Sequence, residues 1–413
     1  MAGTPDDSIA PWITATPTEW LENARAAGTL LDGVARRTPI ELSRRALIGS
    51  PTALKCENMQ CGGSFKIRGA YVRIARMPPD QRDRGVVAAS AGNHAQGVAL
   101  AAGLLGTRAT VFMPRDASLP KVAATRGYGA DVRLVGHSVD EALVAAQEYA
   151  AQTGAAFIHP FDHPDVIAGQ ATVGIEILEQ YPDVRTIVVS AGGGGLAAGI
   201  AVVVRALRPD VRVVAVQAQQ AAALAASVRA GHPIALSDAS TMADGIAVRR
   251  PGSLTLPLVS RYVDEIRTVS EEAIAHAVLA CLERAKLVVE PAGAAALAAV
   301  MDDSSAFPSP VVAVLSGGNV DPIVLLRILR HGLAAAGRYL TFHVTLPDRP
   351  GALAALLTAL AAVEANVLDV VHERTQAALA VDEVEVALQV ETRGQEHSQE
   401  VLETVARLGY AVS

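Results

Sequence analysis

Cysteine, aromatic residues and long uncharged apolar runs are all scarce in this chain of 413 residues. Its three cysteines, Cys56, Cys61 and Cys281, are scattered without metal-ligand spacing, which argues against a disulfide framework or a zinc site and favours a reducing compartment. Aromatic residues make up only 4% of the chain, whereas 51% of it is hydrophobic. That apolar half is mainly Ala, Val and Leu, which suits helices packed on parallel strands.

Blocks of positive charge are also missing, and the formal net charge is -7. A groove that follows nucleic-acid phosphates would need such a block, so we expect small-molecule chemistry and no nucleic-acid partner. No uncharged apolar stretch reaches the length of a membrane span, and residues 1–9 lack the basic start and apolar run of a secretion signal. We therefore expect a cytoplasmic protein without a membrane partner.

Strand-like runs alternate with alanine-rich helical stretches through most of the chain. The runs lie at residues 86–89, 109–113, 131–135, 155–158, 186–189, 211–216 and 311–315. This βαβ rhythm predicts an α/β protein with two doubly wound parallel-sheet lobes. We expect a catalytic domain over residues 1–330, with its small lobe at about 55–154, and a linker at 331–339.

Residues 340–413 have a different pattern. A strand near 341–346 precedes a helix through residue 363, strands at 367–373 and 383–391, a helix at 395–408 and a last strand near residue 410. The order βαββαβ predicts a separate ferredoxin-like module.

Lys66 is the most informative single residue. It follows the glycine pair Gly62 and Gly63 and begins an apolar helical segment, so a loop and a helix start would hold it at a defined position in the fold. A lysine can form an imine with an aldehyde cofactor once its amine is desolvated or held beside another charge. A single lysine is more often a solvated surface residue, so its surroundings decide between the two interpretations.

Three of the predicted strands end in nearly the same turn: SAGNH at residues 90–94, SAGGGGL at 190–196 and SGGN at 316–319. Glycines allow a tight turn with unshielded N–H groups, and the start of the following helix adds partial positive charge. Such turns bind anions, and in open α/β sheets the ligand lies at these strand ends.

The tetraglycine turn could belong to a dinucleotide-binding motif, because Gly192, Gly194 and Ala197 have the required spacing. A nicotinamide enzyme also needs an acidic residue roughly 20 positions later, and this chain has Gln217 there. The Gly-Lys-Ser/Thr of a nucleoside-triphosphate loop is missing as well. A cradle for a single phosphate remains.

Together, these motifs resemble a known family. SFKIRGA at residues 64–70, SAGNHAQG at 90–97, the tetraglycine and SGGN at 316–319 resemble the pyridoxal-phosphate (PLP) enzymes of the tryptophan-synthase-β fold type, and among them the threonine dehydratases, over about residues 35–330. The resemblance implies that Lys66 binds the cofactor covalently, that Asn93 binds its ring hydroxyl and that Ser316 faces its pyridine nitrogen. It further implies two sets of ligands: the phosphate would be held by Gly192, Gly193, Gly194, Gly195 and Leu196, and the substrate carboxylate by Ser64, Ser90, Gly92 and His94.

The expected activity is the dehydration and deamination of L-threonine, and of L-serine, to 2-oxobutanoate or pyruvate and ammonia. Related dehydratases carry a threonine where this chain has Gly62, so dehydration of serine or hydroxyaspartate stays open as an alternative. Serine racemases have a serine at the position of Ala91, and an alanine cannot supply their second proton donor. Residues 217–223 lack the carboxylates with which those racemases bind a divalent metal, so we expect no metal site.

The last module resembles an ACT domain, a small amino-acid-sensing unit, through its segment LPDRPGAL at residues 346–353 and Asn366. The resemblance implies an amino-acid effector at Asp348, Pro350, Gly351 and Leu353. We expect this effector to be isoleucine or valine, as a pathway product, and the protein to be a homodimer or homotetramer. A module that only dimerises is the alternative. A catalytically idle amino-acid sensor is a third interpretation of the whole chain, which the intact Lys66, Asn93 and Ser316 disfavour.

Overall fold

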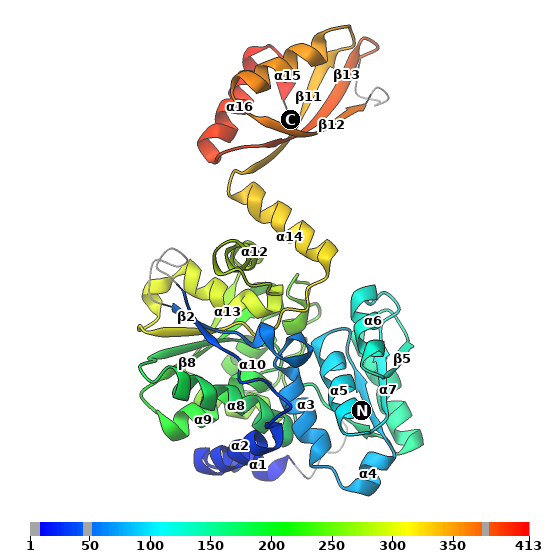
Figure 1. Cartoon of the computed structure of the whole chain (residues 1–413), viewed down its shortest axis with the longest axis vertical. Coiled ribbons are helices and arrows are strands. Elements are labelled where there is room, and N and C mark those ends of the chain that lie inside the picture. Colours follow the sequence, from blue (N-terminus) through cyan, green and yellow to red (C-terminus); the bar gives the residue numbers. More distant parts are fainter. Residues whose placement is uncertain (1–8, 44–51, 374–379, 413) are drawn as a thin grey trace. The chain divides into compact units, whose positions relative to one another are not determined.

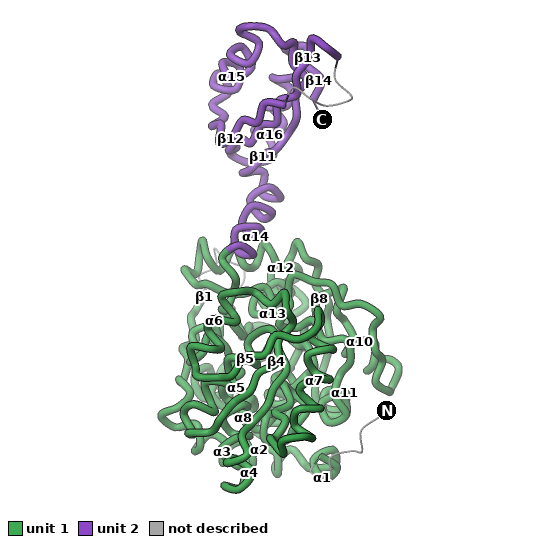
Figure 2. Tube along the Cα trace, turned by 90° about the vertical axis from the view of Figure 1, so that its right-hand side faces the viewer, with its two compact units in different colours: residues 1–322 green, residues 323–413 purple. Residues whose placement is uncertain are grey.

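A computed structural model describes residues 9–43, 52–373 and 380–412 of the chain. The chain consists of two compact units, residues 1–322 and 323–413 (Figure 2). Among the described helices, none has the length and apolar character needed to cross a membrane. The expectation that the chain lacks a secretion signal concerns residues 1–9, and residues 1–8 lie outside the described ranges.

The first unit contains a six-stranded sheet in the order β1-β2-β10-β7-β8-β9. Its strands are β1 (Ile40–Ser43), β2 (Thr52–Lys55), β7 (Thr186–Ser190), β8 (Arg212–Ala218), β9 (Glu265–Val269) and β10 (Val311–Val314). All neighbouring pairs are parallel except β1 with β2. The central strands are buried along their length, which is why they are continuous apolar runs in the sequence.

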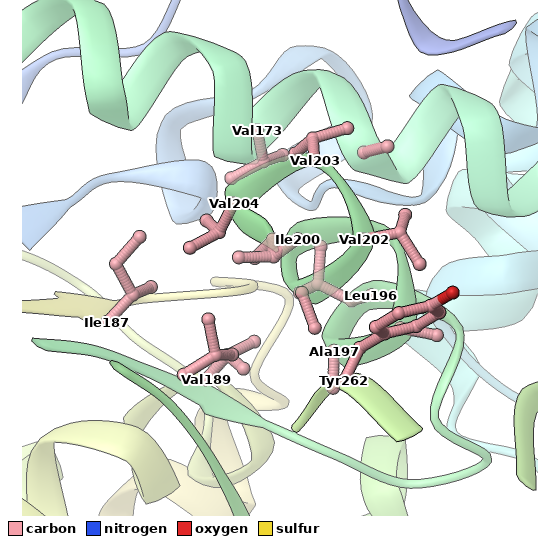
Figure 3. Packing of buried hydrophobic residues seen from close by; sticks show 14 of the residues in the cluster. Val173, Ile187, Val189, Leu196, Ala197, Ile200, Val202, Val203, Val204 and Tyr262 are labelled. Carbon is pink, nitrogen blue, oxygen red and sulfur yellow. The ribbon is translucent and has the colours of Figure 1, made fainter. Parts of the chain in front are cut away.

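Helices cover both faces of this sheet (Figure 1). One face carries α12 (Glu271–Ala280) and α13 (Pro291–Asp302), and the other carries α2 (Pro17–Leu31), α8 (Pro164–Gln180) and α9 (Gly195–Leu207). α9 is buried from Gly195 to Val204, and its side chains fill the core between the sheet and α8 (Figure 3). The two helices approach closely at Gly199, where a Cβ would lie 2.8 Å from the backbone nitrogen of Ala171.

A smaller, fully parallel sheet in the order β5-β4-β3-β6 forms the second lobe of the first unit. Its strands are β3 (Val86–Ala89), β4 (Ala109–Met113), β5 (Asp131–Leu134) and β6 (Ala156–Phe157). Its helices are α3 (Lys66–Ala75), α4 (Pro79–Asp83), α5 (Asn93–Leu104), α6 (Leu119–Gly127) and α7 (Val139–Thr153). α3 packs against both α5 of this lobe and α8 of the large lobe, so it lies where the two lobes meet.

Three shorter helices complete the first unit: α1 (Ala10–Thr14), α10 (Ala223–Ala230) and α11 (Thr255–Tyr262). The predicted α/β fold with two parallel sheets is confirmed.

The second unit consists of α14 (Pro322–Ala335), β11 (Tyr339–Pro347), α15 (Ala352–Ala362), β12 (Asn366–Glu373), β13 (Glu383–Glu391), α16 (Gln395–Arg407) and β14 (Ala411–Val412). Its sheet is antiparallel in the order β12-β13-β11-β14. Buried residues alternate along β13 with partly exposed ones and pack on α15 and α16. The predicted βαββαβ order is therefore confirmed, whereas the expected domain limits stay a prediction; the contact-based division falls after Pro322, and α14 extends into the expected linker.

Candidate active site

The predicted glycine turns lie at the carboxyl ends of parallel strands, as expected. Residues 192–195 follow β7, residues 316–319 follow β10, and residues 90–92 follow β3. The segment before Lys66 is joined to the β10 turn by backbone contacts: Phe65 N donates to Ser316 O at 3.2 Å, Gly318 N donates to Gly63 O at 2.8 Å, and Ser64 forms a β-bridge with Gly317. The start of α3 is thus fixed to the end of the central sheet.

Lys66 is the first residue of α3, and its amine donates to the carbonyl of Pro160 at 2.9 Å. The chain has only three other lysines. Lys55 and Lys121 are paired with the carboxylates of Glu176 and Asp244, and Lys286 is exposed and donates to a backbone carbonyl. Within the described ranges, Lys66 is the partly buried lysine that has no carboxylate in contact.

Burial lowers the pKa of the Lys66 amine to about 8, although the nearby charge of Glu290 acts in the opposite direction. An ordinary lysine has a pKa near 10.5, so at neutral pH a larger fraction of Lys66 is the neutral amine. Lys66 is therefore suited to nucleophilic and proton-transfer chemistry.

The loop from residue 158 to 162 positions several parts of this site. Pro160 accepts the Lys66 amine, and the Phe161 ring packs against the tetraglycine turn. Asp162 accepts the backbone N–H groups of Leu254 and Thr255 at 3.0 and 2.9 Å, where α11 begins. One loop thus sets the position of the lysine amine relative to the glycine turn.

The tetraglycine turn presents unpaired donors. Gly194 has a φ of +92°, and α9 begins directly after it. In the part of the chain that the structure describes, the N–H groups of residues 192–196 donate to no protein acceptor. A turn with free amides at a helix start favours the binding of an anion such as a phosphate group.

Asn93 lies at the first turn of α5 and is held by two side chains. Its Oδ1 accepts from Asn319 Nδ2 at 2.9 Å, and its Nδ2 donates to Glu290 Oε1 at 2.5 Å. Ser316 is 4% exposed, and among the described residues its hydroxyl has one long contact, 3.5 Å, with the carbonyl of Ala292. Ser316 therefore keeps hydrogen-bonding capacity for a ligand.

The residues expected at the substrate carboxylate lie around the start of α5. Ser90 Oγ accepts from Gly92 N at 3.1 Å, and Ser64 is buried before α3. The His94 ring contacts the carbonyl of Ile158 at 2.8 Å, and burial, reinforced by the charge of Lys66, lowers its pKa to about 3. The His94 side chain is therefore neutral and engaged, which leaves its backbone N–H at the helix start for a ligand.

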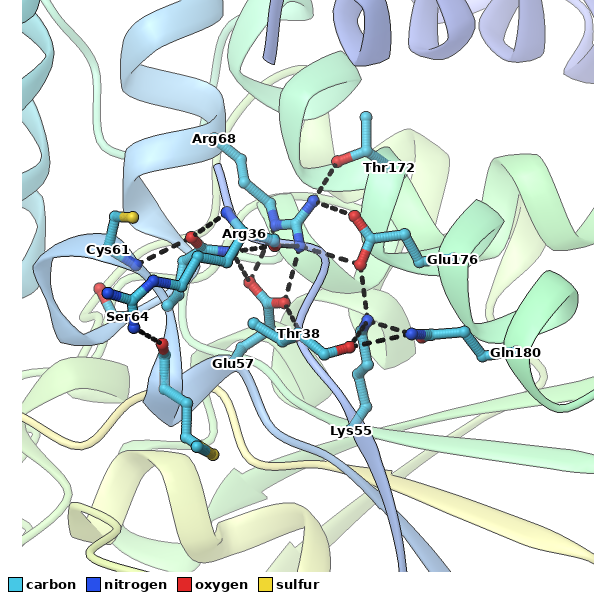
Figure 4. Close-up of polar contacts among 12 residues, drawn as sticks. Arg36, Thr38, Lys55, Glu57, Cys61, Ser64, Arg68, Thr172, Glu176 and Gln180 are labelled. Carbon is cyan, nitrogen blue, oxygen red and sulfur yellow. Dashed lines mark hydrogen bonds and ion pairs between the residues drawn. The ribbon is translucent and has the colours of Figure 1, made fainter. Parts of the chain in front are cut away.

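A buried network of charges fixes α3 two residues beyond Lys66 (Figure 4). Arg68 donates to Glu57 at 2.8 and 2.9 Å and to Glu176 at 2.6 and 3.0 Å, and Lys55 donates to the same Glu176 at 2.6 Å. Two cations face two carboxylates, so the buried charge is balanced. The network joins α3 to β2 and α8 and holds the base of the Lys66 helix.

In the second unit, a cavity of about 260 Å³ lies beside the loop between β11 and α15. Three of the four expected effector residues, Asp348, Pro350 and Leu353, line it together with His372 of β12. Gly351 is not part of the lining; it has a φ of +90° and caps α15. The cavity has room for a ligand of amino-acid size.

Comparison with known proteins identifies the class of this site. The sequence profile of the pyridoxal-phosphate dependent enzymes matches residues 31–317. The chain belongs to this family, as its motifs predicted.

The chain is 45% identical over 394 residues to the L-threonine ammonia-lyase of Thermotoga maritima, covering 95% of this chain and 98% of that protein. It is also similar to the processed form of threonine deaminase isoform 2 from Solanum lycopersicum, with a TM-score of 0.73, 34% identity and coverage of 76% of this chain and 93% of that chain. Maize serine racemase gives a TM-score of 0.71 at 36% identity, with 76% and 98% covered.

The residues present fit PLP. A lysine amine free of carboxylate contacts, a turn of unpaired amides for one phosphate, and a buried serine hydroxyl with unused capacity are the donor set that an aldehyde-bearing, phosphorylated pyridine requires. The predicted cofactor is thus confirmed by the family and is consistent with the site.

Sequence reasoning missed Pro160, Phe161 and Glu290 at this site. A carbonyl and an aromatic ring leave no motif. Glu290 did leave a signal, because it is the only charged residue between positions 287 and 300.

Proposed function

We propose that this protein is a PLP-dependent L-threonine ammonia-lyase in which Lys66 carries the cofactor. The observation that carries the proposal is the setting of the Lys66 amine, partly buried, with a lowered pKa and without a carboxylate partner, beside the anion-binding turn at residues 192–196. The similarity to threonine ammonia-lyases over almost the whole chain supports threonine as the substrate.

The free amides of residues 192–196 would hold the cofactor phosphate, Asn93 the ring hydroxyl and Ser316 the pyridine nitrogen. When bound, the cofactor supplies an aldehyde that links covalently to amines and an electron-withdrawing ring that weakens bonds at the amino acid's Cα. A serine hydroxyl stabilises a protonated ring less than a carboxylate would, so Ser316 favours rapid loss of a β-leaving group.

The amino-acid carboxylate would bind at the start of α5, to the backbone N–H of His94 and to Ser64 and Ser90, with Gly92 held in the turn by its N–H donating to Ser90 Oγ. The partial positive charge of the helix start favours that anion. Lys66 would take the Cα proton as general base.

The reaction balances without an oxidant or a metal. The Cα–H and Cβ–O bonds of threonine break, the Cα proton passes to Lys66, and one proton is delivered to the departing hydroxyl, which leaves as water, so the number of protons on the enzyme is unchanged overall. The released enamine tautomerises and takes up water, which gives 2-oxobutanoate and ammonia. Serine would give pyruvate by the same steps.

A keto-acid assay with L-threonine, L-serine and hydroxyaspartate tests this proposal. We expect turnover with threonine and slower turnover with serine, and Lys66→Ala should abolish both because no other amine replaces it. Lys286→Ala, which removes an exposed lysine, is the matched control and should behave like the wild type. Near wild-type turnover by Lys66→Ala would refute the assignment, and preference for hydroxyaspartate would favour the alternative substrate.

We also propose that the second unit is an ACT-type module that senses an amino acid, isoleucine or valine, in a homodimer or homotetramer. The cavity lined by Asp348, Pro350 and Leu353 supports this role. Effectors typically change affinity 5- to 150-fold, so isoleucine or valine should shift the threonine saturation curve, and Asp348→Ala should weaken that response.

Glu403→Ala on the exposed side of α16 should leave the response unchanged. If neither amino acid shifts the curve of the wild type, the module serves assembly only. Sedimentation of the purified protein would report the oligomeric state.

A further inference from the structure

Asn93, Asn319 and Glu290 form a short chain of hydrogen bonds anchored on a backbone carbonyl. Asn319 Nδ2 donates to Gly62 O at 2.7 Å and to Asn93 Oδ1 at 2.9 Å. Asn93 Nδ2 then donates to Glu290 Oε1 at 2.5 Å. Four separate segments of the chain thus meet in one chain of hydrogen bonds through two side-chain amides.

The chemistry of these groups allows only one orientation of the Asn93 amide. A backbone carbonyl can only accept, so the Asn319 atom that faces Gly62 must be nitrogen. That nitrogen donates to Asn93, so the facing Asn93 atom must be oxygen, and the Asn93 nitrogen points to the carboxylate. One N–H of Asn93 then remains for a ligand.

The carboxyl of Glu290 is tightly enclosed and has few hydrogen-bond partners. Glu290 is 3% exposed and lies directly before α13. A Cβ on Gly317 would overlap Glu290 Oε1, so the glycine at this position admits the carboxyl. Among the described residues, Asn93 is the one side chain that donates a hydrogen bond to it. Burial of a carboxylate costs free energy unless the group is paired and hydrogen-bonded, so the contact with Asn93 is what this burial provides for.

We propose that Glu290 is a positioning residue for cofactor binding: its buried carboxyl, with Asn319, locks the Asn93 amide so that a single N–H is left for the cofactor. The inference rests on the proposed function, because it takes Asn93 as a cofactor ligand. It assigns to Glu290 no contact with the reacting atoms.

The same contact makes cofactor binding dependent on pH. Burial, together with the charge of Asp244, raises the pKa of Glu290 to about 7, while Asn93, Lys121 and Lys66 act in the opposite direction. Since the pKa is raised, the carboxyl gains a proton as the pH falls below about 7. A neutral carboxyl accepts a weaker hydrogen bond than a carboxylate, so the lock on Asn93 loosens on the acid side.

Titration of cofactor-free protein with PLP measures this role without relying on turnover. Glu290→Ala should bind PLP roughly ten-fold more weakly at pH 8, because one charge-assisted hydrogen bond is lost. Glu290→Gln keeps an acceptor for Asn93 and should bind within about three-fold of the wild type. Glu179→Gln, an exposed carboxylate on α8, is the matched control and should not change the affinity.

The pH dependence separates positioning from a merely structural role. The ratio of the PLP dissociation constants of Glu290→Gln and wild type cancels the titration of PLP itself. Because the Glu290 charge also raises the pKa of Lys66, the Lys66 amine is titrated separately in both proteins and its contribution is removed from the ratio. This ratio should be up to about three at pH 8 and should fall toward one by pH 5.5, where the wild-type carboxyl is also neutral, with a midpoint near 7, and the Glu179→Gln ratio should stay constant.

The outcomes distinguish this inference from the proposed function. Wild-type protein that binds no PLP would overturn both. Wild-type protein that binds PLP and consumes threonine, with unchanged affinity and a constant ratio in folded Glu290→Gln and Glu290→Ala, would overturn the role of Glu290 alone.

Discussion

Replacement of Gly193 by alanine tests how the phosphate turn is built. A Cβ at this position would overlap the Phe161 ring, with Cδ1 at 2.5 Å. Gly193 does not have a positive φ, in contrast to Gly194, so the substitution adds a steric clash without backbone strain. The ring cannot simply withdraw, because its own backbone packs against Gly195, where a Cβ would lie 3.1 Å from the carbonyl oxygen of Phe161.

The size of the effect follows from this clash. Overpacking of a close contact costs about 1–3 kcal/mol, and 1.4 kcal/mol is a ten-fold change in an equilibrium constant. The clash displaces the turn in the folded protein, so we expect the PLP affinity to fall roughly ten-fold. The part of the overpacking cost that does not appear in PLP affinity should appear as a lower free energy of unfolding.

PLP titration and denaturant unfolding of four proteins would measure this: wild type, Gly193→Ala, Phe161→Ala and the double variant. Removal of the ring should restore room for the new methyl group, so the double-mutant cycle should give a coupling of about 1–2 kcal/mol. Gly127→Ala, whose Cβ would meet no atom within 4 Å, is the control and should bind PLP normally. Unchanged PLP affinity and stability in Gly193→Ala, or a coupling near zero, would refute the packing argument.

Three further predictions concern other parts of the account. Arg68→Ala should lower the free energy of unfolding by about 3–5 kcal/mol in denaturant titrations, because it leaves buried carboxylates without their cation. Arg37→Ala, which removes an exposed arginine, is the control and should lower it by less than about 1 kcal/mol. Similar losses in the two variants would contradict the role of the network. The rate at which cofactor-free protein binds PLP should rise with pH and level off above about 8, because the lowered pKa of Lys66 makes its amine neutral there. A rise that continues to pH 10 would contradict that pKa. Ala91→Ser should produce D-serine from L-serine, detected by chiral chromatography, because it adds a proton donor beside the start of α5; racemisation by the wild type would show that Ala91 does not limit the reaction.

The buried architecture was predictable from the sequence because parallel strands covered on both faces are continuous apolar runs. The strands from Val86, Ala109, Thr186 and Val311 all follow this rule. β9 escaped prediction because it lies at the sheet edge and carries the polar sequence EIRTV, with its first four residues not buried.

The principal site residues were predictable for a related reason. Carboxyl ends of parallel strands meet at one edge of a sheet, so the glycine turns after β7 and β10, which belong to the same sheet, had to lie in one region. The turn after β3 belongs to the smaller sheet, so this rule does not place it beside the other two. Contacts between distant side chains follow no such rule. Arg68 and Glu176 are 108 positions apart, and Asn93 and Glu290 are 197 apart, so their pairing leaves no local pattern.

The central claim is that Lys66, among the four lysines of the chain, carries the cofactor. Reduction of the PLP-loaded protein with borohydride makes the cofactor linkage permanent, and peptide mass spectrometry then shows which lysine bears it. The account predicts one cofactor per chain on the peptide that contains Lys66. A cofactor fixed to Lys55, Lys121 or Lys286 in protein that still consumes threonine would contradict it.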